Sequence, residues 1–432
     1  MSKLGSLNLG FIVLLVYIDQ NFISIPMIIM AILYFLAFLF STKKNVLGIF
    51  LFLMMISTST LLYIANVYFL IFLMKNYHSK TPLNNTLVMV IILILYEGVH
   101  VLLNSFYGYD ESVIKWLGFS ICLILFIYLK PLQKEIDIVL TFKYMLYGFI
   151  SYSVLTIGTY INLYNVSEFF TVIRRFGYLP YHKEEGFLLI NPNMVGKHSA
   201  FIISCYLVLT NLKKIRIAPS NLVLIIYVGI IGALTVSRGF ILVLLLILVL
   251  FLFMNFIKQR FLPIIVVAIT GIMTFLIISK LFNQLIININ KRIFETEDIS
   301  GTRFTIYELY LDIIMSNVDI FIFGLGMQDY ILKLQNYNSN IFLASHNIII
   351  EVITIWGGIG LLIVSLFLVK LITESRVFMN HDFYHKTIVL IPLLSLLISA
   401  MFGQFFISYY HTFGLLIMSL IILNQEEDKS YV

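Results

Sequence analysis

Long apolar runs separated by short polar segments dominate the chain. About 20 consecutive apolar residues cross a hydrocarbon core as a helix, so most of these runs predict one transmembrane helix each. In lipid, the backbone polar groups of such a segment must be satisfied internally, which favours helices. The sequence therefore predicts an all-α polytopic membrane protein. The runs lie at about 5–19, 22–41, 45–74, 83–104, 113–129, 138–160, 195–212, 220–236, 239–257, 261–279, 346–369, 387–402 and 405–423.

The run 45–74 is too long for one ordinary span and short for two. Hydroxyl side chains at residues 57–60 can satisfy backbone groups at a turn, and they lie near the middle of the run. A hairpin there gives about 14 transmembrane helices, and 12 or 13 remain alternatives.

The distribution of basic residues favours the hairpin. With it, 16 of the 28 Lys and Arg residues lie on one side, and most of the others lie in or beside two long loops. Basic residues in short loops mark the cytoplasmic side, whereas long loops count little. The two long loops, about 161–194 and 280–345, are then predicted to lie outside. No linker or composition shift divides the chain, so residues 1–432 are predicted to form a single integral membrane domain.

Composition excludes a soluble protein, because 60% of the residues are hydrophobic and 12% are charged, whereas soluble domains carry about 25% charged residues. The net charge of +6 reflects topology, since the basic residues cluster between the spans. No basic and aromatic platform indicates a nucleic-acid partner. Both cysteines, Cys122 and Cys205, lie in apolar runs and do not indicate a redox compartment.

Candidate chemistry gathers on the predicted outer side. In the first outer loop, Arg174 and Arg175 suit anionic groups, because the guanidinium fork matches phosphate oxygens; the alternative is a solvated or headgroup-binding pair. Asn191-Pro192-Asn193 is by itself a turn signal. Arg238, in Ser237-Arg238-Gly239, lies between two apolar runs, where a charge costs roughly 2.5–3.5 kcal/mol at a helix centre. It is therefore a functional candidate, with an interfacial anchor as the alternative.

In the second outer loop, Ser300-Gly301-Thr302-Arg303 precedes a predicted helix that ends at Ser316. Thr302 is the expected N-cap, and an arginine in the first turn of a helix makes an anion site. The alternative is an ordinary loop helix with an exposed arginine. Gly324-Leu325-Gly326 predicts a flexible approach to the segment that carries His346.

His346-Asn347 closes this loop and opens the run 346–369, so an imidazole lies where water meets membrane. Histidine exchanges protons near neutral pH and suits acid–base chemistry there; the alternative is an interfacial histidine that caps a helix. Glu97 and His100 share one face of a predicted span and form a second candidate pair.

Metal binding has weak support in the sequence. The acidic residues 295–298 offer carboxylates to a divalent cation, but such a run is more often solvated. No Cys and His cluster indicates zinc. We therefore predict no metal and no cofactor.

Together, these motifs resemble the O-antigen ligase and polysaccharide repeat-unit polymerase (Wzy-type) superfamily. The sequence departs from the family pattern at one point. The family often has an aromatic residue soon after the arginine that corresponds to Arg303, and Phe304 and Tyr307 only approximate it. The likeness rests on His346-Asn347 with Gly357 and Gly360, Ser237-Arg238-Gly239, residues 300–303, residues 324–326, Asn191-Pro192-Asn193, and the spacing from Arg175 to Gly186.

The resemblance implies a GT-C-like membrane glycosyltransferase that acts on undecaprenyl-diphosphate-linked oligosaccharides at the outer face of the cytoplasmic membrane, in contact with membrane lipid. It implies that Arg238 and Arg303 clamp the diphosphate and that His346 orients or deprotonates the acceptor hydroxyl. No cofactor is implied. The expected substrate-binding residues are Arg174, Arg175, Asn193, Asn347 and Glu97.

Three functions are compared: a polymerase, a ligase and a transporter. A polymerase would build O-antigen or capsule and would have a chain-length regulator protein as a partner, whereas a ligase would move a finished glycan to another acceptor. We expect the polymerase because of the many spans and the second arginine-bearing loop. A transporter of lipid-linked glycans predicts charges spread through many spans and two similar halves. Because the charges here concentrate in outer loops and their borders, we expect an enzyme.

Overall fold

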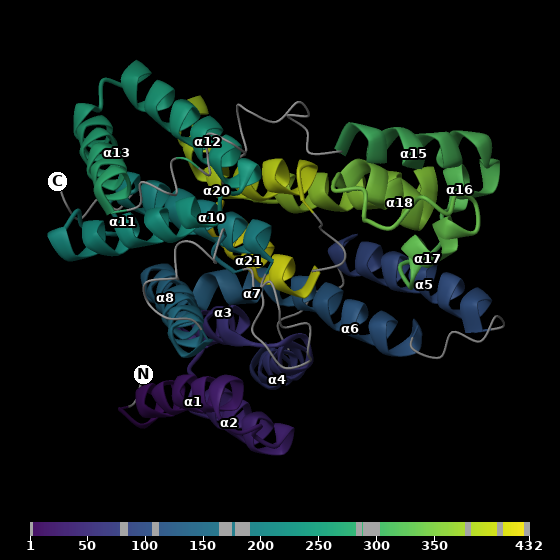
Figure 1. The fold of residues 1–432 in the computed structure, drawn as a ribbon, viewed down its shortest axis with the longest axis horizontal. Helices are drawn as coiled ribbons and strands as arrows, with labels where there is room; N and C mark the ends of the chain where they lie inside the picture. Colours follow the sequence, from purple (N-terminus) through teal and green to yellow (C-terminus); the bar gives the residue numbers. More distant parts are fainter. Residues whose placement is uncertain are drawn as a thin grey trace.

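The computed structural model describes residues 3–77, 85–105, 112–163, 175–177, 191–281, 287, 303–375, 382–403 and 409–426. Within these ranges the chain forms helices and no strand (Figure 1). The helices are α1 Lys3–Asn21, α2 Met27–Leu39, α3 Val46–Ile56, α4 Ser59–Tyr77, α5 Asn85–Ser105, α6 Ser112–Leu125, the 3-10 helix η2 Phe126–Tyr128, α7 Leu129–Glu135, α8 Ile138–Leu163, α10 Pro192–Asn211, α11 Pro219–Leu234, α12 Arg238–Ile257, α13 Phe261–Leu281, α15 Arg303–Ser316, α16 Val318–Phe323, α17 Tyr330–Gln335, α18 Ile348–Thr373, α20 Phe383–Met401 and α21 Tyr409–Ile422.

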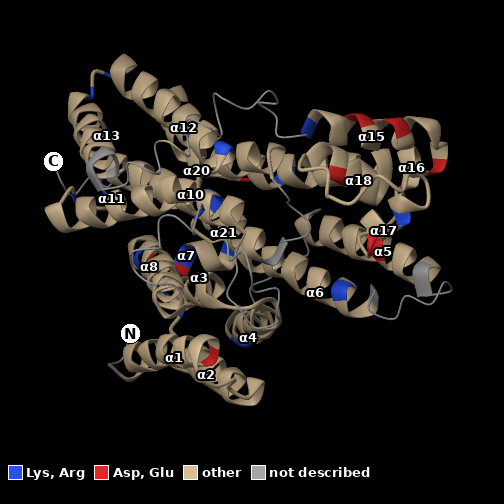
Figure 2. Ribbon diagram, in the orientation of Figure 1, with Lys and Arg blue, Asp and Glu red and all other residues tan. Residues whose placement is uncertain are grey.

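Eight helices of the described chain are long and apolar enough to cross a membrane, and five shorter apolar helices accompany them. Their lengths and composition confirm the predicted class, an all-α polytopic membrane protein. Figure 2 shows that charged residues lie mainly near helix ends, while long stretches of helix carry none. The number of spans and the GT-C-like architecture stay predictions.

The run 45–74 divides where the hydroxyl residues predict a turn. Ser57 is extended (φ −97°, ψ 142°) between α3 and α4, and its hydroxyl lies 2.8 Å from that of Tyr34. At the far ends of the two helices, the Lys43 ammonium lies 5.2 Å from the centre of the Tyr77 ring. The chain therefore returns to the face from which it started, as the hairpin requires. With 11 residues, α3 is about 16 Å long, shorter than a hydrocarbon core of about 30 Å.

The predicted cytoplasmic segments contact one another, which supports their placement on one face. Each contact joins segments that are distant in the sequence. The contacts are Asp137 N to Lys44 O at 3.0 Å, Lys43 Nζ to Glu135 Oε2 at 3.3 Å, Lys130 Nζ to Glu374 Oε2 at 2.8 Å, Lys258 Nζ to Asp382 Oδ2 at 2.8 Å, and Arg260 Nη1 to Asn211 Oδ1 at 3.0 Å.

The centre of the molecule is built on helices that are buried on all sides. Every residue of α3 is buried, which fits a helix that is apolar around its circumference. Nearly all residues of α10 are buried as well, among them the polar side chains of Lys197, His198 and Ser199. On α8, a Cβ atom at Gly148 would lie 2.8 Å from the Cα atom of Phe52 in α3. The glycine thus permits close approach of two helix backbones, a common device between membrane helices.

Helix α18 is kinked, and the kink holds the loop that leads to the candidate histidine. Gly357 has φ 65° and ψ −170° inside the helix. The carbonyl groups of Thr354 and Ile355 accept hydrogen bonds from the backbone N–H groups of Leu325 (2.9 Å) and Gly326 (2.8 Å). The predicted flexible approach at residues 324–326 is therefore wrong, because two backbone hydrogen bonds fix this segment to α18. In Figure 1, α15 and α16 lie beside α18.

Candidate active site

Three helices begin beside one another, and each begins with a capping residue. The Asn191 side chain accepts a hydrogen bond from the N–H of Asn193 (2.9 Å) at the start of α10. Ser237 accepts from the N–H of Phe240 (3.4 Å) at the start of α12. Asn347 accepts from the first turn of α18. The N-terminus of a helix carries partial positive charge and favours anions, so this arrangement suits an anionic ligand.

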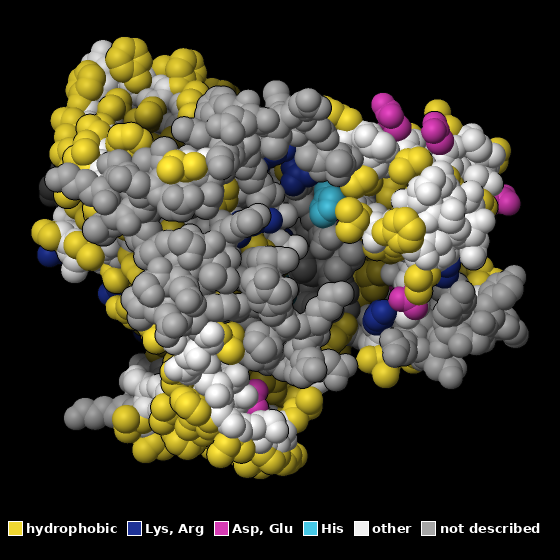
Figure 3. Space-filling model, viewed as in Figure 1, with side chains coloured by type: hydrophobic (Ala, Val, Ile, Leu, Met, Phe, Trp, Pro, Cys, Tyr) yellow, Lys and Arg dark blue, Asp and Glu magenta, His cyan; other side chains and the backbone are white. Residues whose placement is uncertain are grey.

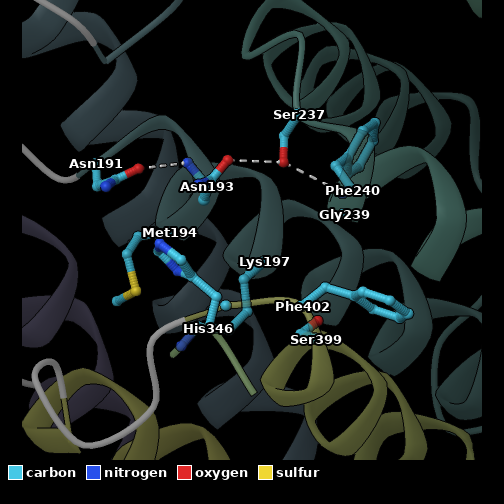
Figure 4. A pocket seen from close by; sticks show the side chains of 11 residues that line it. Asn191, Asn193, Met194, Lys197, Ser237, Gly239, Phe240, His346, Ser399 and Phe402 are labelled. Carbon is cyan, nitrogen blue, oxygen red and sulfur yellow. Dashed lines mark hydrogen bonds between the residues drawn. The ribbon is translucent and has the colours of Figure 1, made fainter. Parts of the chain in front are cut away.

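A pocket of about 510 Å³ lies at these helix starts. Figure 4 shows Asn191, Asn193 and Ser237 along one wall, with Met194, His346 and Lys197 across from them. The pocket thus joins the end of the first outer loop, the start of α12, the segment before α18 and the end of α20. Its lining residues are Asn191, Asn193, Met194, Lys197, Ser237, Gly239, Phe240, His346, Ser399, Phe402 and Gly403.

Asn193 is the polar junction of this wall. Its Oδ1 accepts hydrogen bonds from Arg175 Nη2 (3.1 Å) and from the Ser237 hydroxyl (3.2 Å). Arg175 also donates from Nε to the carbonyl of Thr235 (3.0 Å). Arg175 therefore ties the first outer loop to α10 and to the turn before α12. Of the other residues predicted in this loop, Arg174 and Gly186 lie outside the described residues.

The candidate cations and the candidate base interact electrostatically. Arg238 is the first residue of α12, and Arg303 is the first residue of α15. Burial lowers the pKa of Arg303, and the positive charge of Arg238 lowers it further. Burial, followed by the positive charge of Arg303, lowers the pKa of His346 below its ordinary value. The structure thus brings together all three residues that the sequence predicts to be catalytic. The predicted helix from Arg303 to Ser316 is confirmed as α15, while its expected cap, Thr302, lies outside the described residues.

His346 has the local features of a constrained functional residue. Its backbone φ is 55°, a left-handed conformation that is uncommon outside glycine and that concentrates at functional sites. Its carbonyl accepts a hydrogen bond from the Tyr307 hydroxyl of α15 (3.4 Å). Its Nδ1 atom is buried and has no hydrogen-bond partner among the described residues. The residue also lines the pocket.

Of the predicted substrate-binding residues that the structure describes, only Asn193 lines the pocket; Arg175, Asn347 and Glu97 do not. The Asn347 amide oxygen accepts from the N–H groups of Ile349 (2.9 Å) and Ile350 (3.3 Å), so it serves as a helix cap. Glu97 is buried, and its carboxylate accepts from the Met327 N–H (2.9 Å) and the Trp356 indole N–H (2.5 Å). Glu97 thus lies in the packing of α5 against α18. A role of these residues in substrate binding stays a prediction.

The sequence analysis did not single out several pocket residues. Lys197 is an ionisable residue within the apolar run 195–212, a position that by itself indicates function. It follows Asn193 by four residues, so the two share a helix face. Ser399, Phe402 and Gly403 carry no motif. They reach the pocket because α20 packs against α10 and α12, which no local pattern reveals.

An apolar cavity of about 630 Å³ adjoins the polar pocket. Ile348 lines the cavity two residues after His346, and Leu397 lines it two residues before Ser399. Thr412 of the cavity accepts a hydrogen bond from Lys197 of the pocket (3.0 Å). A polar and an apolar compartment are thus in contact. The cavity is lined by Leu93, Phe119, Leu123, Ile348, Trp356, Val364, Phe367, Leu368, Leu396, Leu397, Thr412, Phe413 and Leu416.

Figure 3 shows a histidine and basic side chains gathered near the middle of one face, where the surface is hollowed. Among the described residues, no group of three or more His, Cys, Asp and Glu side chains is arranged to hold a metal ion. The acidic residues 295–298 lie outside the described ranges.

Comparison with known proteins identifies one family. Residues 222–365 match the family described as O-antigen ligase. No curated protein and no solved structure matches the chain. The matched segment contains Arg238, Arg303, His346 and the glycines of the α18 kink, but neither Arg175 nor α10. Residues 222–365 are thus an O-antigen ligase family region, which confirms the superfamily that the sequence motifs indicate.

Proposed function

We propose that the protein is a membrane glycosyltransferase that polymerises undecaprenyl-diphosphate-linked oligosaccharide repeat units into a surface polysaccharide, at the outer face of the cytoplasmic membrane. The convergence of three helix N-termini with Arg238, Arg303 and His346 carries this proposal. A site with this much positive charge beside a histidine fits a reaction that expels an anionic group and needs a base.

The diphosphate is the anion that fits this site. Arg238 and Arg303 bind its oxygens and stabilise the negative charge that develops as it leaves the sugar. Mutual repulsion between the two arginines favours a bound anion between them, because the anion relieves that repulsion. Because a diphosphate is already a good leaving group, the reaction does not strictly require a metal.

His346 acts as the base for the acceptor hydroxyl. With its pKa lowered, the imidazole is neutral near pH 7 and accepts the proton of the attacking hydroxyl. The acceptor oxygen forms the new bond to the anomeric carbon, the bond from that carbon to the phosphate oxygen breaks, and the diphosphate leaves with the electron pair. The proton resides on His346 until solvent removes it.

The neighbouring apolar cavity supports a lipid-linked donor. A hydrocarbon chain is the ligand that matches a lining of leucine, isoleucine, valine and aromatic side chains. One substrate molecule with a charged head and an apolar chain would occupy both compartments.

A ligase that moves a finished glycan to another acceptor is the alternative function. The description of the matched family favours it, because that description names O-antigen ligase. Both reactions use the same donor chemistry and differ in the acceptor. The polymerase is preferred on the predicted number of spans and on the second arginine-bearing loop.

The test is the length of surface glycan in a deletion strain complemented with wild type, His346→Ala, Arg238→Ala or Arg216→Ala. Arg216 is exposed on the predicted cytoplasmic face and serves as the matched arginine control. A polymerase predicts glycans of one repeat with the first two variants and full length with the control. Full-length glycan that accumulates on the lipid carrier would establish the ligase. Unchanged glycans with both variants would refute the mechanism and favour transport.

A further inference from the structure

Lys197 is a charged residue in the interior of the helix bundle, and the mechanism above does not use it. Its side chain is 8% exposed, yet it lines the polar pocket. It lies on α10, outside the residues that match the family. Figure 4 shows it near His346 among the lining side chains.

Two neighbouring helices supply groups that interact with the Lys197 ammonium. It donates a hydrogen bond to the Thr412 hydroxyl of α21 (3.0 Å). The carboxylate of Glu351, in the first turn of α18, is fully buried and interacts electrostatically with it. Glu351 in turn accepts a hydrogen bond from the Tyr330 hydroxyl of α17 (3.1 Å). The second outer loop is thus connected to the pocket lysine.

Burial of the Lys197 charge costs free energy, which a role in ligand binding would explain. Ionisable residues within membrane proteins are rare and mark substrate or ion sites. Attraction between two buried charges is weak support for stability, since the cost of removing both from water offsets it. A lysine ammonium carries three N–H donors, and Thr412 takes one of them. The position of Lys197 in the pocket wall therefore suits contact with an anion.

The position of Lys197 also indicates which phosphate of the lipid-linked diphosphate it would contact. Thr412 lines the apolar cavity, so Lys197 lies at the border between that cavity and the pocket. In a lipid-linked diphosphate, the phosphate attached to the hydrocarbon chain occupies such a border, while the phosphate attached to the sugar lies nearer the reacting carbon.

We propose that Lys197 binds the lipid-side phosphate of the donor and that Glu351 is the positioning residue that holds its ammonium at the pocket wall. This inference rests on the proposed function, in which Arg238 and Arg303 bind the diphosphate beside the sugar. It adds a third cation to the site and links the second outer loop to substrate binding.

The test measures binding of three probes to purified protein in lipid nanodiscs: undecaprenyl diphosphate, undecaprenyl monophosphate and undecaprenol. Lys197→Met should weaken binding of both phosphorylated probes by about tenfold or more, the usual size of a lost hydrogen bond to a charged group, and leave undecaprenol binding unchanged. Lys197→Arg should restore most of the affinity. Lys143→Met is the matched control, because Lys143 lies within the span of α8 and its side chain is exposed.

Glu351→Gln tests the positioning role in a transfer assay. It should raise KM for the lipid-linked donor with little change in kcat, the signature of weakened uniform binding. A fall in kcat at unchanged KM would overturn the role of Glu351. Equal affinity of wild type and Lys197→Met for the monophosphate would overturn the role of Lys197.

Failure of the two proposals is distinguishable. If wild type binds undecaprenol as tightly as both phosphorylated probes, the anion site of the proposed function fails together with this inference. If wild type prefers the phosphorylated probes and Lys197→Met keeps that preference, only the inference fails. Should Lys197→Met not yield folded protein, Lys197→Gln decides by the same comparison.

Discussion

His346 has, in one residue, the features that a general base at a membrane border needs. Its backbone is held in a left-handed conformation, and it lines the polar pocket. The charge of Arg303 disfavours protonation of the ring. A base must be unprotonated at the working pH. Burial and the charge of Arg303, the arginine that we propose to stabilise the leaving group, both favour the neutral imidazole.

This coupling predicts a shift in the pH dependence of transfer. In wild type, activity should fall with decreasing pH only below the ordinary range of histidine, because burial and Arg303 lower the pKa of His346. In Arg303→Met, the residual activity should fall at higher pH, because removal of the positive charge raises that pKa. The measurement is kcat/KM against pH, with Arg303→Lys as the charge-preserving control. A Met variant with an unshifted acid limb would contradict the coupling.

Individual residues also show what the sequence predicts and what it leaves open. Arg238, Arg303 and His346 converge as predicted, because a charge beside an apolar run has few positions to occupy. Asn347 caps α18, and its predicted role in substrate binding stays a prediction. A polar residue before an apolar run suits either role, and only its hydrogen-bond partners distinguish them. Lys197 was not selected, although its place within the apolar run 195–212 is a local signal; only its interactions with Thr412 and Glu351 depend on the fold.

At the scale of helices, the kink of α18 determines where the second outer loop attaches. The irregular backbone at Gly357 accompanies two carbonyl groups of the helix that accept hydrogen bonds from the loop. The sequence showed the glycines but not this pairing, since residues 325 and 355 are far apart along the chain. The break in the run 45–74 was predictable, because the hydroxyl residues that produce it are local.

The kink predicts different effects of alanine at adjacent glycines. A Cβ atom at Gly357 would lie 2.1 Å from the Ile322 carbonyl oxygen, and its φ is 65°. Gly357→Ala should therefore lower the free energy of unfolding by about 3 kcal/mol or more. At Gly358, the nearest atom to a Cβ is the Phe321 carbonyl oxygen at 3.5 Å, an ordinary contact. Gly358→Ala should change stability by about 1 kcal/mol or less. The measurement is thermal unfolding of the two purified variants. Equal losses of stability in Gly357→Ala and Gly358→Ala would argue against the kink.

At the scale of the whole molecule, the contacts among the basic segments define two faces. The pairs that join Lys44 to Asp137, Lys130 to Glu374 and Lys258 to Asp382 gather segments that the positive-inside rule places in the cytoplasm. The candidate catalytic residues lie in the segments assigned to the other side. The charge bias of the short loops predicts which side each segment faces, because that bias is local to each loop. It did not supply the packing order of the helices.

The hairpin of α3 and α4 predicts a labelling pattern. Cysteines introduced at Lys43 and Lys75, before and after the hairpin, should react with a membrane-impermeant maleimide only after the cells are permeabilised. A cysteine at Asp312, which is exposed on α15, should react in intact cells. The two native cysteines are buried, so their background is low. If Lys43→Cys and Lys75→Cys differ in accessibility, residues 45–74 form a single crossing.

The contact between the polar pocket and the apolar cavity affects how the enzyme can be isolated. Any amphiphile with an anionic head and a single hydrocarbon tail has the same two-part shape as the compartments that meet at Lys197 and Thr412. Detergent monomers of this type would occupy the proposed donor site during extraction. The activity of the solubilised enzyme would then depend on the charge and tail length of the detergent, independently of whether the fold survives.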